Sequence, residues 1–357
     1  MSNTTENALP ADWQDLDRRF RFFQLLFVAL KAGIPTALSD GPVAPATLAE
    51  TLKLDETRLR RVLRGLVWCG ALDTDEQERY GLTPAGRLLL DDGPQQFAAN
   101  VRWQGEFFFR AWGQLDNYLF EGTAPFPQAH GGTELFPLLA RDSALSDLFH
   151  APMTAHSARS SAGIAAHPAF DAARFLVDVG GGEGQLLADV LQTHTQAHGI
   201  VFDLPGLEAS ATALLNRADL LDRCRFCGGN MFAPGALPPG ADVYILKWIL
   251  HDWDDAHAVL LLRHCAEAMG DQSHVLVMER RMPPSVNTSN TFLVQADLNM
   301  LCLNGGAERT LAEYEALFAS AGIRLLSALP VDGFPDFFLL DGVRANTKTG
   351  ELTTDNQ

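Results

Sequence analysis

From about residue 171 onward, short apolar runs alternate with segments of helical periodicity, and this alternation constrains the fold more than any other feature. The runs are apolar throughout rather than at every second position, which is typical of strands buried on both faces of a parallel sheet. Helices between such strands cover the two faces, so the sequence predicts an open α/β domain. We expect strands or helices over 175–179, 185–193, 199–203, 207–218, 223–227, 242–246, 255–269, 274–278 and 311–321, then an antiparallel edge hairpin around 325–329 and 337–340.

The first 110 residues have a different, mainly helical character. Thr47 and Glu50 have the spacing of a capping box, which predicts a short helix opening there. A second short helix and a polar hairpin complete the pattern of a winged helix. The other expected elements are helices over 16–32 and 59–69 and a hairpin over 73–80.

A winged helix raises the possibility of DNA binding, and charge is the evidence that bears on it. The second helix carries Arg58, Arg60, Arg61 and Arg64, but residues 41–92 hold 7 basic against 9 acidic groups, which is no electrostatic footprint for DNA. The chain has a net charge of −17; residues 1–110 contribute −2 and residues 111–357 contribute −15. Nucleic acids and anionic membranes are bound through clustered Lys and Arg, so we expect neither as a partner.

The cysteines and the first residues indicate a cytoplasmic protein. The start is polar and acidic, without the basic and apolar regions of a secretory signal, and the apolar stretch 22–30 is too short to span a bilayer. Five cysteines in a long chain do not suggest a disulfide framework. We expect Cys224 and Cys227 to be small hydrophobic residues, and the polar tail 346–357 to be disordered.

The first strand of the α/β region ends in a glycine-rich turn that begins at Asp178 and includes Gly180 and Gly182. Ligands of open parallel sheets lie at the carboxyl ends of the strands. The dinucleotide fingerprint fails because Gln185 stands where its last glycine is required. Asp203 ends the next strand, 25 residues after Asp178, where a carboxylate can accept hydrogen bonds from ribose hydroxyls.

The third strand leads into Asn230, Met231 and Phe232. The two apolar side chains could enclose an adenine ring, since both are soft and apolar, and Asn230 could bond the ring edge.

These motifs resemble those of the S-adenosylmethionine-dependent small-molecule O-methyltransferases, typified by plant caffeic-acid enzymes and bacterial secondary-metabolite enzymes. The resemblance runs over nearly the whole chain. It rests on D-V-G-G-G-E-G, F-D-L-P, G-G-N-M-F, L-K-W-I-L-H-D-W-D-D, H-V-L-V-M-E-R and G-G-A-E-R-T. It implies a helical dimerisation domain over 1–110 and a Rossmann-like methyltransferase domain over 111–345, with a helical linker over 111–170. It also implies a homodimer. The cofactor-binding residues it implies are Asp178, Gly180, Gly182, Asp203, Leu204, Asn230, Met231, Phe232, Lys247 and Trp248.

The resemblance further implies that His251 is a general base oriented by Glu279 and Glu308. A phenol has a pKa near ~10 and is a weak nucleophile while it keeps its proton. An imidazole beside two carboxylates has its charged form stabilised and its tautomer fixed. No metal is required by this chemistry, and we expect none. Thr310 and Glu313 have the spacing of a second capping box after Glu308.

The acceptor pocket implied by the resemblance is aromatic and partly polar. Its implied residues are Phe149, Met153, His156, Trp248, Asn299 and Met300. This chain has Asn230 where most relatives have Asp, which predicts binding that survives but weakens. It has Asn299 where relatives usually have an apolar residue, which suggests an acceptor with an extra polar substituent unless the backbone satisfies this amide.

The expected function is therefore O-methylation of a planar aromatic metabolite such as a phenazine, a polyketide or a flavonoid-like phenol. Two alternatives remain open on the sequence. One is N-methylation of a phenazine-type heterocycle. The other is a winged-helix regulator that senses S-adenosylmethionine without catalysing a reaction.

Overall fold

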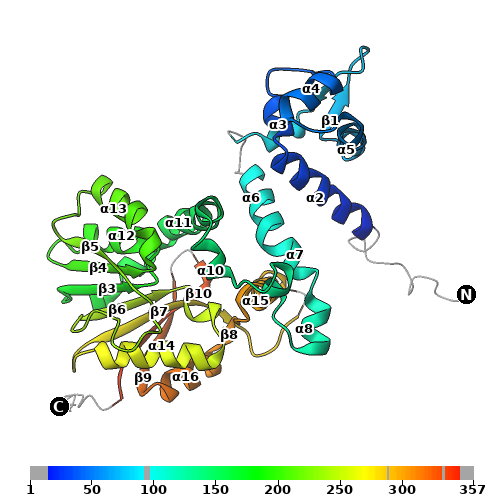
Figure 1. Ribbon diagram of the computed structural model, residues 1–357. Coiled ribbons are helices and arrows are strands. Elements are labelled where there is room, and N and C mark those ends of the chain that lie inside the picture. The colour runs from blue at the N-terminus through cyan, green and yellow to red at the C-terminus, as the bar shows by residue number, and fades with distance from the viewer. Residues whose placement is uncertain (1–14, 92–96, 288, 332–333, 346–357) are drawn as a thin grey trace, which may run out of the picture. The chain divides into compact units, whose positions relative to one another are not determined.

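The computed structural model describes residues 15–91, 97–287, 289–331 and 334–345 (Figure 1). The contacts of the chain divide it into two compact units, residues 1–110 and 111–357. Residues 346–357, expected to form a tail, lie outside the described residues. In the part of the chain that the structure describes, no helix is both long and apolar enough to cross a membrane.

The first unit packs helices and a two-stranded antiparallel hairpin around one apolar core. Its elements are α2 (Leu16–Lys31), α3 (Ile34–Ala37), α4 (Pro45–Leu52), α5 (Glu56–Trp68), β1 (Leu72–Thr74), β2 (Tyr80–Leu82) and α6 (Phe97–Trp103). The hairpin pairs Leu72 with Leu82, as the winged-helix pattern predicts.

The capping box predicted at Thr47 is wrong. Helix α4 begins at Pro45, and its N-cap is Ala44. Proline suits this first position because it has no N–H to leave unpaired there and its fixed φ is already helical. Thr47 therefore lies inside the helix, and its carbonyl oxygen accepts a hydrogen bond from Thr51 Oγ1.

The second unit is built on an eight-stranded sheet in the order β5-β4-β3-β6-β7-β10-β9, with β8 paired to β7. Strands β3 to β7 run parallel, and β10 and β9 are the antiparallel edge that the sequence predicts. The strands are β3 (Phe175–Val179), β4 (His198–Asp203), β5 (Cys224–Gly228), β6 (Val243–Lys247), β7 (His274–Met282), β8 (Arg309–Thr310), β9 (Ile323–Val331) and β10 (Phe334–Arg344).

Helices cover both faces of this sheet (Figure 1). Alternate strand residues explain why: Leu176 packs into one core with α12 and α13, whereas Val177 packs into a second core with α14 and α16. The covering helices are α12 (Gln185–Thr193), α13 (Glu208–Arg217), α14 (Asp255–Ala268) and α16 (Leu311–Ser320). Helix α7 (Phe109–Trp112) spans the boundary between the units. The remaining helices of the second unit are α8 (Leu115–Glu121), α9 (Pro125–Ala129), α10 (Leu135–Leu139), α11 (Ser143–Ala165) and α15 (Thr291–Asn304).

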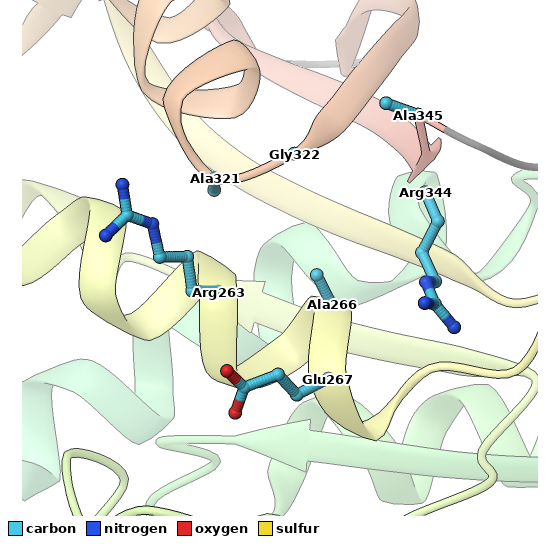
Figure 2. A pocket seen from close by; sticks show the side chains of 7 residues that line it. All are labelled: Arg263, Ala266, Glu267, Ala321, Gly322, Arg344 and Ala345. Carbon is cyan, nitrogen blue, oxygen red and sulfur yellow. The ribbon is translucent and has the colours of Figure 1, made fainter.

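A surface pocket lies at the end of the sheet where β7 begins and β10 finishes (Figure 2). Two arginines line it, but each guanidinium binds a carbonyl oxygen at the end of a helix. Arg263 donates to Ser320 O at 2.9 Å, and Arg344 donates to Met269 O at 3.3 Å. These bonds satisfy carbonyls that a helix C-terminus leaves unpaired, so the arginines have a structural role.

Candidate active site

The strand order reverses between β3 and β6, and the predicted site residues gather at the carboxyl ends of these strands. Such a reversal leaves a crevice, because the connections from the two neighbouring strands run to opposite sides of the sheet. Asp178 lies next to the end of β3, and Lys247 is the last residue of β6. The topology thus brings together residues that are far apart in sequence.

Backbone geometry explains the glycines after β3. Gly180 has a φ of +71°, and a Cβ atom there would lie 2.4 Å from Ile249 Cδ1, so only glycine fits. Gly182 N donates to Asp203 Oδ2 at 2.8 Å, and Leu204 N donates to Asp203 Oδ1 at 2.6 Å. Burial raises the pKa of Asp203, while these two backbone donors lower it. The loop thereby fixes the carboxylate that the sequence assigns to a ribose.

Asp178 and Lys247 form an electrostatic pair beneath this loop. Burial raises the pKa of Asp178 to about 7, against the influence of Lys247. Burial also lowers the pKa of Lys247 to about 8, against Asp178 and Glu279. Asp178 Oδ2 is buried and has no hydrogen-bond partner among the residues that the structure describes. This oxygen therefore keeps an unused capacity to accept a hydrogen bond.

Trp248 follows Lys247 in a conformation that non-glycine residues rarely adopt, with a φ of +57°. The backbone N–H of Trp248 donates to Met278 O at 3.0 Å, and Lys247 Nζ lies 3.5 Å from the centre of the Trp248 ring. The ring also packs 5.3 Å from that of Phe337. Strained residues of this kind cluster at functional sites.

The residues predicted to bind adenine follow β5. Asn230 is exposed, and Met231 and Phe232 are half-buried. Asn230 Oδ1 accepts a hydrogen bond from Phe232 N at 3.0 Å, and the Phe232 ring packs edge-on against Trp253 at 4.5 Å. The tight turn therefore orients the amide of Asn230. Leu204 is 38% exposed at the end of the neighbouring strand.

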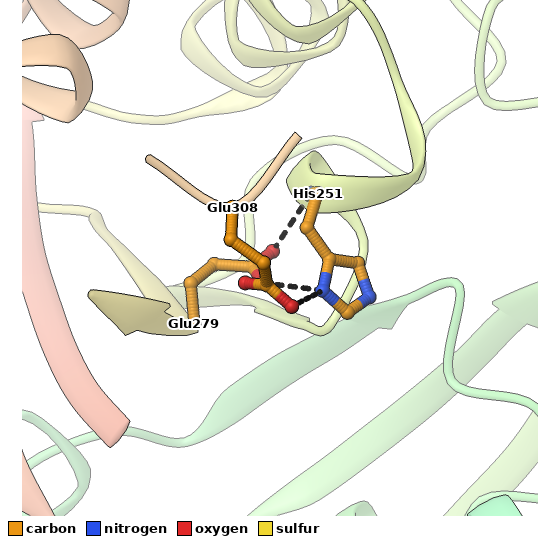
Figure 3. A group of neighbouring side chains, drawn as sticks. All are labelled: His251, Glu279 and Glu308. Carbon is orange, nitrogen blue, oxygen red and sulfur yellow. Dashed lines mark hydrogen bonds and ion pairs between the residues drawn. The ribbon is translucent and has the colours of Figure 1, made fainter. Parts of the chain in front are cut away.

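His251 lies with Glu279 and Glu308 in a buried cluster built from three segments (Figure 3). Its Nδ1 is 3.1 Å from Glu308 Oε1 and 3.5 Å from Glu279 Oε2. Glu308 thus makes the closer contact with the imidazole. The arrangement places the Nδ1 proton toward the two glutamates and leaves Nε2, which lies 3.9 Å from Asp252 Oδ1, as the nitrogen that can accept a proton.

Glu279 chiefly holds the turn that carries His251. Its Oε1 accepts backbone hydrogen bonds from Ile249, Leu250 and His251, at 3.0, 2.8 and 3.3 Å. Three donors on one oxygen fix the short helical turn 250–252 against the end of β7. Sequence reasoning gave both glutamates the same role; the structure separates them.

The ionisation of the cluster follows from its charges. Burial opposes the imidazolium, but Glu279 and Glu308 favour it more strongly, so the pKa of His251 is raised to about 9. Burial raises the pKa of Glu279 to about 7. Burial also acts against ionised Glu308, yet His251 and Arg280 outweigh it and lower the pKa of Glu308 to about 2. Glu308 is the permanent anion of the three.

The same three side chains could also ligate a divalent cation, because their donor atoms all lie within 4.8 Å of one another. However, Arg280 Nη1 donates to Glu308 Oε1 at 2.8 Å. This guanidinium already supplies a positive charge at the carboxylate, and it would repel a metal ion. The donor set therefore fits a hydrogen-bonded histidine–carboxylate pair better than a metal centre.

The predicted acceptor-binding residues lie on α11 and α15. Phe149 and Met153 are half-buried on α11, and Met153 packs against the same core as Trp248. Asn299 and Met300 are half-buried on α15. The side chain of His156 is outside the described residues, although its backbone belongs to α11.

Three neighbours of the site were not foreseen from the sequence. Trp112 Nε1 donates to Asn299 Oδ1 at 2.9 Å, so a side chain rather than the backbone satisfies this amide oxygen. Asp297 Oδ1 accepts from Glu308 N at 2.9 Å. Trp112 is 187 residues from Asn299, and nothing in the sequence links them. The sequence does contain an indication of Arg280, because this residue directly follows Glu279 after an apolar run.

Comparison with known proteins identifies both parts of the chain. Residues 14–92 match the model of an O-methyltransferase dimerisation domain, and residues 112–324 match that of an O-methyltransferase domain. The chain is 35% identical to a mitomycin biosynthesis 6-O-methyltransferase of Streptomyces lavendulae, over 87% of this chain and 88% of the relative. It is 32% identical to an 8-amino-8-demethylriboflavin N,N-dimethyltransferase of Streptomyces davaonensis, over 86% of this chain and 88% of that relative.

A solved structure extends the likeness to the fold. It is an O-methyltransferase from neocarzinostatin biosynthesis, in complex with S-adenosylmethionine and 2-hydroxy-5-methyl naphthoic acid. The two chains are 32% identical and superimpose with a TM-score of 0.76, over 91% of this chain and 96% of the other.

Proposed function

Because this chain belongs to the O-methyltransferase family, we propose that it methylates a hydroxyl group of a planar aromatic metabolite, with S-adenosylmethionine as methyl donor and His251 as general base. The observation that carries the proposal is the buried pairing of His251 with Glu308. This pair lies on the segments that follow β6 and precede β8, beside the strand ends that carry Asp178 and Lys247.

The residues at the strand ends suit this cofactor. Asp178 presents a buried carboxylate oxygen without a partner among the described residues, which fits the ammonium group of a methionine moiety. No atom lies within 4 Å of the place where a side chain at Gly182 would begin, so the loop leaves open space. Asp203 would accept from ribose hydroxyls, and Asn230 and Met231 would border the adenine. Two carboxylates also favour a cationic cofactor.

His251 would remove the proton of the acceptor. S-adenosylmethionine, when bound, would supply the methyl group to the acceptor oxygen, and its sulfur would leave as a neutral thioether. His251 Nε2 takes the hydroxyl proton during this displacement, while Glu308 and Glu279 stabilise the imidazolium that forms. The burial of the cluster keeps water from competing for the proton. General-base assistance of this kind contributes about 10²–10⁴ in rate.

The acceptor class follows from the aromatic and polar side chains of the pocket. Phe149, Met153 and Trp248 would flank a flat ring. Trp112 holds the Asn299 oxygen, so the amide N–H groups of Asn299 would face the acceptor. This favours an aromatic hydroxyl compound that carries a carbonyl or a similar hydrogen-bond acceptor. A methyl-transfer screen of hydroxynaphthoates, hydroxyphenazines, flavonoids and simple catechols would identify it.

The role of His251 is tested by His251→Ala and His251→Gln. We expect both variants to bind S-adenosylmethionine by calorimetry with affinity within a few-fold of the wild type, and to lose about 10²–10⁴ in kcat. The glutamine variant keeps a polar group between the two carboxylates if the alanine variant fails to fold. The control is His198→Ala, at the exposed start of β4, which should retain full activity. Full turnover in folded His251→Gln would refute the base assignment.

A second candidate function is N-methylation, which the riboflavin-type dimethyltransferase relative favours. An amine acceptor also loses a proton, so His251 would keep its role. Mass spectrometry of the product, with the methyl group located by fragmentation, separates O- from N-methylation.

A further inference from the structure

Arg280 is a buried charge that the proposed mechanism leaves without a role. It lies on β7 directly after Glu279, and its side chain is only 14% exposed. Its Nη1 donates to Glu308 Oε1 at 2.8 Å, and the same oxygen lies 3.1 Å from His251 Nδ1. One carboxylate oxygen therefore serves both the imidazole and the guanidinium.

Aromatic rings hold this guanidinium in place. Its Cζ lies 4.9 Å from the ring centre of Phe337, 5.4 Å from that of Phe292 and 5.7 Å from that of Trp248. Cations are attracted to ring faces, most strongly where water is excluded. Arg280 Nε is buried and has no hydrogen-bond partner in the described part of the chain. The contact with Glu308 is thus the side-chain hydrogen bond that anchors this guanidinium among the rings.

We propose that Arg280 is a positioning residue of the methyl-transfer site: through the shared oxygen of Glu308 it limits the negative charge that the imidazole of His251 experiences. The inference rests on the proposed role of His251 as the base. It assigns to Arg280 a function that neither its packing nor the stability of β7 requires.

The other charges around His251 make such a limit necessary. Glu279 on β7, Glu308 before β8 and Asp252, the residue after His251, all favour the imidazolium. Asp297 on α15 faces Glu308. Lys247 at the end of β6 is attracted by the charge of Glu279 and repelled by that of Arg280. Tyr314 on α16 borders both glutamates. Three acidic groups around one imidazole favour its protonated form. The cations close to this cluster are Arg280 at Glu308, Lys247 near Glu279, and the buried Arg309, whose Nη1 donates to Leu250 O at 2.9 Å.

The sign of the effect follows from Coulomb's law. A cation close to an imidazolium disfavours the charged form, and it also weakens the pull of the carboxylate that it neutralises. Loss of the Arg280 charge therefore makes the proton on His251 harder to remove. The titration midpoint of His251 should move to higher pH in Arg280→Gln, by about one pH unit.

The test follows this titration directly, without any acceptor. The full-length protein is labelled at the Cε1 atoms of its histidines and titrated by NMR, and the His251 signal is assigned by its loss in His251→Gln. We expect Arg280→Gln to raise the titration midpoint of His251. Arg280→Lys keeps a cation, so its midpoint should stay within a few tenths of a pH unit of the wild-type value. The matched control is Arg281→Gln. Arg281 lies 3.7 Å from the ring centre of Phe338, and we expect no change there.

Two outcomes would overturn the inference. One is an unchanged midpoint in Arg280→Gln that still binds S-adenosylmethionine and melts as the wild type does. The other is a shift in Arg280→Lys as large as a shift in Arg280→Gln, because shape rather than charge would then be responsible. If Arg280→Gln does not fold, Arg280→Met, which keeps a long side chain but removes the charge, takes its place with the same expected rise. Failure of the proposed function itself would appear separately, as full turnover in His251→Gln.

Discussion

At the scale of single residues, two glutamates beside one histidine acquire different roles from their partners. Glu308 meets two cationic groups, and its pKa falls to about 2. Glu279 receives backbone donors on one oxygen only, its other oxygen is buried without a hydrogen bond among the described residues, and its pKa rises to about 7. Neighbouring carboxyl groups separate in this way because both cannot be ionised cheaply at close range.

The raised pKa of His251 predicts how activity depends on pH. With a pKa of about 9, only about one per cent of the imidazole is neutral at pH 7 in the unliganded chain. A base must be neutral to accept a proton, so kcat/KM at low substrate concentrations should rise about tenfold per pH unit from pH 6.5 and level off near 9. A profile that is flat between pH 6.5 and 8.5 would contradict this. The His251→Gln variant shows which part of the slope comes from ionisation of the acceptor.

At the scale of elements, the turn before β8 approaches the His251 turn so closely that only glycine fits between them. A Cβ atom on Gly306 would lie 2.0 Å from His251 O, and Ala307 N donates to that oxygen at 3.0 Å. This contact places Glu308 against the imidazole. The two turns, which carry His251 and Glu308 57 residues apart in the sequence, can therefore pack this closely only because position 306 is glycine.

Gly306→Ala is expected to separate these turns and lower kcat by about 10²-fold, since a displacement of about 1 Å in a site can cost that much. The binding of S-adenosylmethionine should change little, because the glycine loop and Asp203 lie on other strands. The control is Gly305→Asn: Gly305 has a φ of +71° with open space around it, and asparagine tolerates this region. Calorimetry and steady-state kinetics measure both quantities. Equal kcat in Gly306→Ala and the wild type would refute the role of the contact.

A second lesson at this scale comes from one tetrapeptide that occurs twice. Thr-Leu-Ala-Glu stands at 47–50 and again at 310–313. At 310–313 both reciprocal hydrogen bonds form, so the capping box predicted there is confirmed. At 47–50 the helix has already begun at Pro45, and Thr47 is in its interior. The pattern specifies a cap only where no earlier residue can start the helix.

At the scale of the whole molecule, the two units differ in charge, and both expose large apolar side chains. The first carries a net charge of −2, and the second carries −15. In the first unit Leu16 and Phe20 are each 58% exposed, and Trp68 is 53% exposed. Large exposed hydrophobic side chains in a dimerisation domain indicate a surface that another chain covers.

We therefore propose a homodimer and expect light scattering to report twice the chain mass of 38.9 kDa. Trp68→Glu should shift the equilibrium toward the monomer, because it places a charge on this apolar surface. The control is Leu119→Glu in α8, which changes a residue of the second unit that is more exposed than Trp68, at 74% against 53%. A monomeric wild type at micromolar concentration would contradict the proposal.

The sequence by itself determined the order of the strands and helices, the parallel sheet with its antiparallel edge, and the type of side chain at each strand end. These properties follow from local periodicity and from the chemistry of neighbouring residues, which a sequence contains in full. It also placed Asp203, which is the last residue of an apolar strand, whereas the choice of His251 rested on the family resemblance.

Only the tertiary structure decided which of these groups touch. It brought Glu308 rather than Glu279 closest to the imidazole of His251 and gave Asn299 a partner in Trp112. It also brought Arg280 to the same oxygen of Glu308 that contacts His251. Each of these contacts joins segments far apart in the chain. Such contacts depend on loop geometry and on strand register, and differences of about 1 Å decide them. Local patterns in a sequence do not encode distances of that size.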